Sequence, residues 1–162
     1  MTDMLLFSPM TIRGIELRNR IVVPPMHQYS AVKGFPTDWH LMNAGKFAAG
    51  GAGLVVVEST KVERRGCGTI GDLGIWDDAF VEPLSRLVKF IKQQNAVPGL
   101  QLGHSGAKGS TQVGWEDMDA PLKAGNWPLM APSPVRWSPA NQVPRAMTRA
   151  DMDQVRDRKS VV

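Results

Sequence analysis

The sequence is poor in the residues that build metal centres and disulfide frameworks. Cysteine occurs once, at Cys67, and histidine occurs three times among 162 residues. One cysteine cannot form an internal disulfide, and with three scattered histidines it supplies too few ligands for a structural zinc site. We therefore expect no metal, and we expect the protein to work in a reducing cytoplasm.

Long apolar runs and blocks of one charge are also missing. The longest apolar stretch, residues 48–57, contains three glycines and is about half the ~20 residues that cross a bilayer. The first residues lack the basic region of a signal peptide. The 19 basic and 15 acidic residues, net charge +4, are mixed along the chain. We expect neither a membrane nor a nucleic-acid partner.

Strand and helix signals alternate along the first hundred residues. Short apolar segments at 10–12 and 15–17 flank the turn dipeptide Arg13-Gly14, which predicts a β-hairpin. Further strands are predicted at 21–23, 54–57 and 97–102, and amphipathic helices between them at 37–48 and 77–92. This alternation is typical of parallel strands with helices packed outside.

The last third of the chain has a different character. Residues 103–147 are rich in glycine and proline and show no periodicity, so they form a candidate functional loop. A further helix is predicted from Thr148, where Asp151 lies at the spacing of a capping box.

Two α/β architectures compete for this pattern. Residues 66–71 match G-x-G-x-x-G, the dinucleotide fingerprint, but they neither leave a strand directly nor open a helix, which favours a plain glycine loop. The alternative is a β/α barrel, whose active sites gather at the carboxyl ends of the strands. Polar residues follow the predicted strands there, at 27–29, 58–60 and 101–104. We predict the first part of a TIM (β/α)8 barrel, with an N-terminal hairpin and about three βα units.

Five short motifs, in order along the chain, resemble those of the Old Yellow Enzyme family of FMN-dependent ene-reductases. They are Asn19-Arg20-Ile21-Val22, Pro25-Met26-His27-Gln28-Tyr29-Ser30, Gly53-Leu54 with Val57-Glu58, Leu73-Gly74-Ile75-Trp76 and Gln101-Leu102-Gly103-His104-Ser105-Gly106. The chain is most similar to the bacterial branch, in which an N-terminal hairpin closes the barrel floor and some members act on aromatic CoA thioesters.

The resemblance implies a set of cofactor contacts. The loop after the first barrel strand would lie along FMN, largely through its backbone, Ser59 would be the small residue beside the isoalloxazine, and Gln101 would bond the pyrimidine edge. The implied cofactor-binding residues are Pro24, Pro25, Met26, His27, Ser59 and Gln101.

Other positions are implied to serve the substrate or the scaffold. Tyr29, the chain's only tyrosine, aligns with a substrate-contacting tyrosine, whereas His40 and His104 match positions that support the scaffold. Two departures stand out: His27 replaces the usual cysteine or threonine, and Ala107 replaces an arginine.

The resemblance also implies an activity. NADH or NADPH would reduce the flavin, which would then pass a hydride to an activated C=C bond of an enone, an enal or an aromatic CoA thioester. The proton donor, the paired substrate-binding residues and the FMN arginines would lie beyond residue 162, so we expect the present chain to be inactive alone. We also expect the complete protein to form a homo-oligomer. A flavin-dependent demethylase or dehydrogenase on the same fold, and a non-catalytic half-barrel binding module, stay open as alternatives.

We predict that residues 1–156 form the partial FMN-binding barrel domain and that residues 157–162 are not native. The helix from Thr148 has no glycine cap, and Asp157 to Val162 shows little amphipathic pattern. One reading frame of a common sequencing adapter translates to the same six residues and a stop. Resequencing the source locus checks this, and a genomic stop codon directly after Val162 would contradict it.

Overall fold

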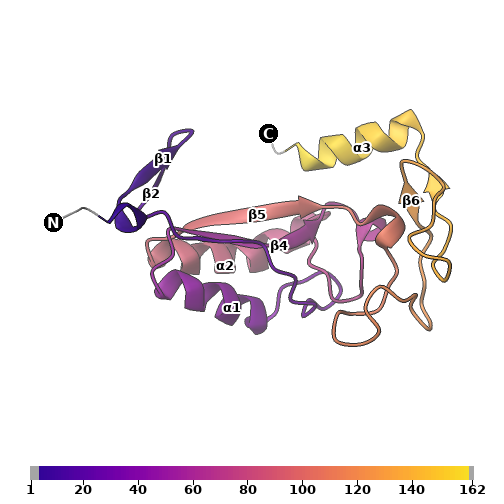
Figure 1. The fold of residues 1–162 in the computed structure, drawn as a ribbon, viewed down its shortest axis with the longest axis horizontal. Coiled ribbons are helices and arrows are strands. Elements are labelled where there is room, and N and C mark those ends of the chain that lie inside the picture. Colours follow the sequence, from indigo (N-terminus) through magenta and orange to yellow (C-terminus); the bar gives the residue numbers. More distant parts are fainter. Residues whose placement is uncertain (1–3, 161–162) are drawn as a thin grey trace.

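The computed structural model describes residues 4–160. Its strands are β1 Met10–Ile12, β2 Ile15–Leu17, β3 Val22–Val23, β4 Leu54–Lys61, β5 Val97–Gly103, β6 Met130–Ala131 and β7 Arg145–Ala146. Its helices are α1 Asp38–Ala49, α2 Val81–Gln93 and α3 Arg149–Lys159 (Figure 1). The predicted order of hairpin, strand, helix, strand, helix and strand is confirmed.

The centre of the fold is a parallel sheet in the order β3-β4-β5, covered on one face by α1 and α2 (Figure 1). Alternation along β4 turns Val55 and Val57 toward these helices, where they pack with Ala48, Leu87 and Ile91 in the buried core. The other face carries Leu54, Val56 and Gly99: a Cβ added at Gly99 would contact both of these β4 side chains. In a complete barrel, this second face is the interior.

The β4–β5 pair contains an irregularity that positions the functional residues. Val57 pairs with Leu100 but Thr60 pairs with Leu102, so one extra β4 residue is accommodated between them, as in a β-bulge. β4 then continues to Lys61, which bridges Gly74 in a parallel pairing. The strand is therefore longer than the predicted 54–57, because the apolar pattern stops where the polar, site-bearing residues begin.

The N-terminal hairpin lies at the amino ends of the parallel strands, the position expected for the floor of a barrel (Figure 1). The segment after it is tied to the turn between α1 and β4. Arg18 donates from Nη2 to the carbonyls of Ala48 and Ala52 at 3.0 and 3.1 Å, and Asn19 donates from Nδ2 to Gly51 at 2.7 Å.

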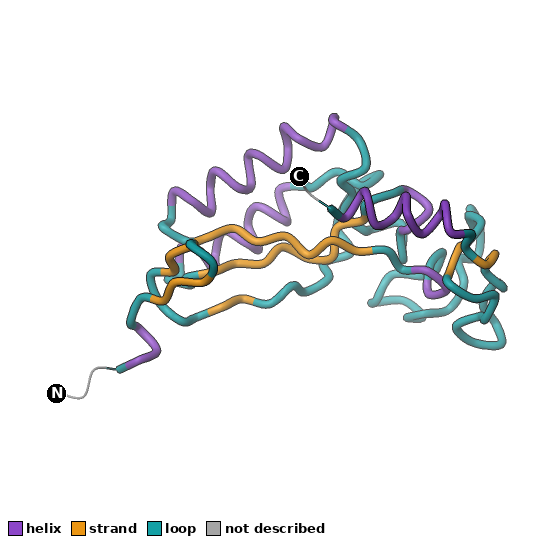
Figure 2. Tube along the Cα trace, turned by 90° about the horizontal axis from the view of Figure 1, so that it is seen from above, coloured by secondary structure: helices purple, strands orange, loops and turns teal. Residues whose placement is uncertain are grey.

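The predicted loop 103–147 is irregular over most of its length, with one short parallel pair, β6 and β7, that periodicity did not indicate. The capping box that begins α3 is confirmed: Asp151 accepts from the Thr148 backbone N–H at 2.8 Å, and its own N–H donates to the Thr148 hydroxyl at 3.2 Å. α3 runs through Lys159. Figure 2 shows it apart from the two helices that cover the sheet. Among residues 4–160, no helix is long and apolar enough to cross a membrane.

Candidate functional site

The predicted site residues gather where the parallel strands end. Gln101 and Gly103 alternate with Gly99 along β5, so all three belong to the sheet face turned away from α1 and α2. Ser59 reaches the same face, because a Cβ at Gly103 would collide with its hydroxyl. The structure thus brings Ser59 and Gln101, which come from two different strands, to one surface.

Asp72 ties three segments together at this end of the sheet. Its side chain is fully buried, and it accepts hydrogen bonds from the Gly68 N–H at 2.6 Å and the Thr69 hydroxyl at 2.7 Å. His27 Nε2 lies 3.3 Å from Oδ1, and Lys61 Nζ lies 3.4 Å from Oδ2. One carboxylate therefore holds the loop after β3 and the end of β4 against its own loop.

The Asp72 carboxylate is kept ionised. Burial by itself would raise the pKa of Asp72, but the hydrogen bond with His27, the charge of Lys61 and the hydroxyl of Thr69 outweigh it and lower that pKa. Lys61 is almost fully buried and also donates to the Ser59 hydroxyl at 2.9 Å. An ionic network thus runs from His27 through Asp72 and Lys61 to Ser59.

A second buried carboxylate, Glu58, holds the loop after β3 from the other side. Glu58 Oε2 accepts from the Gln28 backbone N–H at 2.9 Å. Its Oε1 lies 3.0 Å from His40 Nε2, although the two groups are too poorly aligned for a regular hydrogen bond. His40 Nδ1 accepts from the Thr37 N–H at 3.0 Å, which assigns the ring proton to Nε2, facing Glu58. His40 therefore serves the scaffold, as the sequence predicts.

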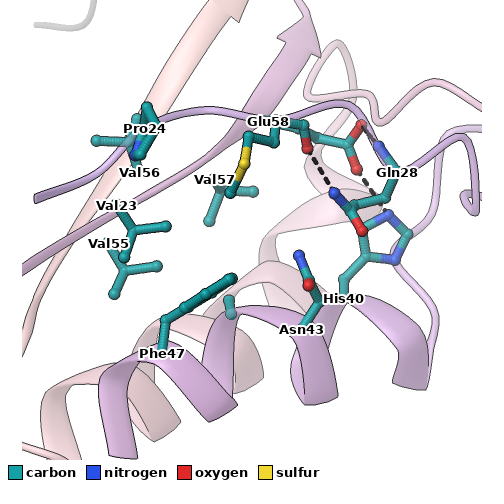
Figure 3. A pocket seen from close by; sticks show the side chains of 12 residues that line it. Val23, Pro24, Gln28, His40, Asn43, Phe47, Val55, Val56, Val57 and Glu58 are labelled. Atoms are coloured by element: carbon teal, nitrogen blue, oxygen red, sulfur yellow. Dashed lines mark hydrogen bonds and ion pairs between the residues drawn. The ribbon is translucent and has the colours of Figure 1, made fainter. Parts of the chain in front are cut away.

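Figure 3 shows the small cavity beside Glu58 and His40, enclosed by α1, β4 and the loop after β3. Its volume is about 20 Å³, and its walls include the apolar side chains of Val23 and Phe47. This is room for about one water molecule. The cavity is thus a small gap in the packing beside the Glu58–His40 contact, and it is far too small for a cofactor.

A third carboxylate, Glu63, pairs with His104. The Glu63 Oε1 atom lies 2.8 Å from His104 Nε2 and 2.8 Å from Arg65 Nε. Burial opposes ionisation of Glu63, but the bonds from Arg65 and His104 prevail and lower its pKa. Burial also lowers the pKa of His104 despite the carboxylate beside it. His104 Nδ1 accepts from the Gly106 N–H at 3.1 Å, so His104 is a neutral scaffold residue, again as predicted.

His27 differs from the other two histidines. His40 and His104 each have both ring nitrogens engaged by the protein, whereas for His27 only Nε2 has a partner among residues 4–160. Its side chain is 27% exposed. Its ring lies 5.0 Å from that of Tyr29, which in turn meets Trp115 edge-on at 5.5 Å. Nδ1 of His27 is therefore the histidine nitrogen left for a ligand.

The remaining predicted positions take simpler roles. Pro24, Pro25 and Met26 form the loop from β3 toward His27, and the Met26 carbonyl accepts from Gln28 Nε2 at 2.7 Å. Cys67 is buried, and burial raises its pKa to about 12, so it is a thiol and not a nucleophile, as the sequence predicts. No group of metal-ligating side chains occurs within residues 4–160.

Sequence reasoning missed Lys61 and Asp72. The signals that could have identified them are a lysine a few residues after an apolar strand and an aspartate directly after a glycine-rich loop. Neither signal says that the two side chains meet, because their contact depends on how the loop folds back onto β4.

A parallel sheet with helices on one face, and with its polar network at the carboxyl ends of the strands, is the first part of a β/α barrel of the enzyme type. The model of the NADH:flavin oxidoreductase / NADH oxidase family matches residues 5–158, and the chain belongs to this family. The resemblance to the Old Yellow Enzyme family is thereby confirmed.

Individual relatives agree. The NADH:flavin oxidoreductase FG08077 of Gibberella zeae is 38% identical over 93% of this chain and 38% of its own length. The Old Yellow Enzyme of Pichia sp. AKU4542 has a similar fold, with a TM-score of 0.79 and 24% identity over 96% of this chain and 41% of that one. A 2-naphthoyl-CoA reductase, solved with 2-naphthoyl-CoA, matches with a TM-score of 0.74 and 19% identity over 95% of this chain and 24% of that one. The chain spans about two fifths of the first two.

Replacing Asp72 tests the ionic network. Asp72→Asn removes the charge that faces Lys61 and His27, and breaking a buried ion pair in this way lowers the free energy of unfolding by about 3–5 kcal/mol. Because the pKa of Asp72 is lowered on folding, its contribution is present above the unfolded carboxyl pKa of about 3.9 and is lost as the pH falls through the folded value. Urea denaturation at pH 7 and at pH 3 measures both effects.

The matched control is Asp117→Asn, because Asp117 is exposed and makes no side-chain bond in the described structure. We expect the control to match the wild type at both pH values. A loss of stability for Asp72→Asn that is as large at pH 3 as at pH 7 would show that the effect comes from packing and not from charge.

Proposed function

We propose that the complete protein, of which this chain is the first part, is an FMN-dependent NAD(P)H oxidoreductase that reduces activated C=C bonds. The observation that carries the proposal is the family match over residues 5–158. We further propose a cytoplasmic enzyme that acts on small molecules and forms a homo-oligomer. The isolated chain of 162 residues is then inactive, because barrels of this type bind phosphate after strands seven and eight.

The residues on the inner face of the sheet fit a flat ring with polar edges. Gln101 is exposed there, and its neighbours on the same face, Gly99 and Gly103, have no side chains that would keep a ring away. An amide both donates and accepts, which suits the pyrimidine edge of a flavin. Ser59, fixed by Lys61, is small enough to lie beside the ring system.

The loop after β3 would supply the other contacts. Pro24, Pro25, Met26 and His27 would lie along the flavin, with Glu58 and Asp72 holding both sides of the loop in place. Rigid support of this kind limits the loss of conformational entropy when a ligand binds.

When bound, FMN supplies the hydride transfer that amino-acid side chains cannot perform. The part played by this chain is to bind and to orient. Tyr29, held between His27 and Trp115, would place its phenol on the carbonyl oxygen of the substrate. We propose enones, enals or aromatic CoA thioesters as substrates, since each carries a carbonyl that polarises the C=C bond. The proton donor lies beyond residue 162 in this proposal.

The test compares the full-length protein with the 162-residue chain. We expect the full-length protein to purify yellow, to be reduced by NADPH or NADH, and to be reoxidised by 2-cyclohexenone, cinnamaldehyde or 2-naphthoyl-CoA. The short chain should retain no FMN after gel filtration. A colourless full-length protein would favour a binding module, and reduction of the flavin by methylated amines without activity on alkenes would favour a demethylase.

His27 offers a sharper prediction about the cofactor. Because Nε2 is on Asp72 and Nδ1 is free of protein partners among residues 4–160, Nδ1 can take part in a hydrogen bond with a ligand beside it. We expect His27→Cys and His27→Thr, which restore the usual residues, to shift the midpoint potential of the bound flavin relative to the wild type at the same pH. Equal potentials for all three proteins would rule out this role.

A further inference from the structure

A second hollow lies on a different side of the loop that carries Asp72. It has a volume of about 1110 Å³ and is walled by the turn 33–35, the loop 63–72, residues 76–80 before α2, Trp127 and α3. We call it the aromatic cleft. None of the proposed flavin contacts lines it, and its size is that of a site for a small organic ligand. The function proposed above makes no use of it.

The floor of the aromatic cleft is a preformed cluster of rings. Phe35 stacks on Phe80 at 4.4 Å with 27° between the planes, and Trp76 meets Phe80 edge-on at 4.9 Å. Gly34 packs so closely on Trp76 that a Cβ would lie 2.6 Å from its ring. Such a rigid aromatic surface with an open side suits a planar ring.

The turn that carries Phe35 also places a cation at the rim. Val32 and Phe35 exchange backbone hydrogen bonds of 3.1 and 3.0 Å, and the residues between them, Lys33 and Gly34, have φ values of +53° and +89°. Two central residues with positive φ define a tight type I′ turn. Lys33 is therefore held at a fixed point beside the rings.

Two cations at the aromatic cleft have no ion-pair partner. Of the three carboxylates that line the cleft, Glu63 pairs with Arg65, Asp72 pairs with Lys61, and Asp77 accepts the backbone N–H of Ala79. Lys33 and Arg64 have no carboxylate within 4.0 Å among residues 4–160. Arg158 also lines the cleft but lies in the tail 157–162 that we predict is not native.

Trp127 closes the aromatic cleft on the side of the loop 103–147. Its indole Nε1 is fully buried, so this atom offers no donor to a ligand in the cleft. An aromatic floor and two cations without ion-pair partners together describe the recognition of a planar ring that carries phosphate.

We propose that the aromatic cleft binds the adenosine phosphate part of a nucleotide-bearing reactant. The adenine would lie on Trp76 and Phe35, and the phosphates would meet Lys33 and Arg64. The inference rests on the proposed function, since both a CoA thioester substrate and the NADPH reductant carry this group. They differ in where the ribose phosphate sits, at the 3′ oxygen in coenzyme A and at the 2′ oxygen in NADPH.

Isothermal titration calorimetry on the full-length, flavin-loaded protein tests the proposal. The probes are adenosine 3′,5′-bisphosphate and adenosine 2′,5′-bisphosphate, with adenosine and orthophosphate as reference ligands. We expect one bisphosphate to bind more tightly than either reference, and the preferred isomer identifies the source as coenzyme A or NADPH. Lys33→Met and Arg64→Met should each weaken binding about tenfold, because each variant loses one charge-assisted bond to a phosphate.

The control is Lys89→Met, an exposed lysine on α2 that does not line the aromatic cleft and should bind the probe as the wild type does. Reoxidation of the reduced flavin by 2-cyclohexenone is measured on the same samples. It should be unchanged in Lys89→Met, which shows that the compared samples are folded and active.

Three results would overturn the proposal: bisphosphates that bind no better than orthophosphate, variants with unchanged affinity, and release of FMN by the probe. The last would place the probe in the phosphate site of the flavin. If the proposed function itself is wrong, the enone reaction fails in the wild type whatever the calorimetry shows, so the two failures are distinguishable.

Discussion

A carboxylate taken out of water must find donors, and this constraint organises the carboxyl end of the sheet. Glu58, Glu63 and Asp72 are all buried there. Their donors come from several segments: the loop after β3, the end of β4, the loop 64–72 and His104 directly after β5. Because none of these donors can leave without exposing an uncompensated charge, loops that would otherwise move are fixed. A site that must hold a flat cofactor gains its rigidity from these ionic contacts as well as from the apolar core.

The three histidines show that similar histidine–carboxylate pairs can have different roles. Each has Nε2 facing a buried carboxylate. In His40 and His104, the second nitrogen accepts a hydrogen bond from a backbone N–H, so no ring nitrogen is left for a ligand. In His27, the second nitrogen has no such partner within the described residues, and Asp72 sets the tautomer that leaves it available. The surroundings of a histidine, more than its presence, decide whether it supports the scaffold or meets a ligand.

Local signals were enough to predict most of the elements. Thr37 and Gly50 mark the ends of α1, and the β-branched run of β4 marks a covered strand. The bulge in β4 could not be predicted, because it exists only in the register with β5. The pairing of His27 with Asp72 joins residues 45 positions apart, which no periodicity reports. Ser59 and Gln101 were identified by resemblance alone, and the structure adds that they share a face.

The contacts of the buried carboxylates at the carboxyl ends of the strands have a consequence for recombination between related barrels. The hydrogen bonds and ion pairs that hold Glu58, Glu63 and Asp72 all come from residues between 27 and 104. The network is thus closed within one contiguous stretch of sequence, and within the described residues β5 pairs with β4 alone. A crossover placed after β5 would carry the whole network intact into a related barrel, where only the pairing of one strand edge would have to be matched. The first three strands therefore constitute a natural unit for building chimeric barrels.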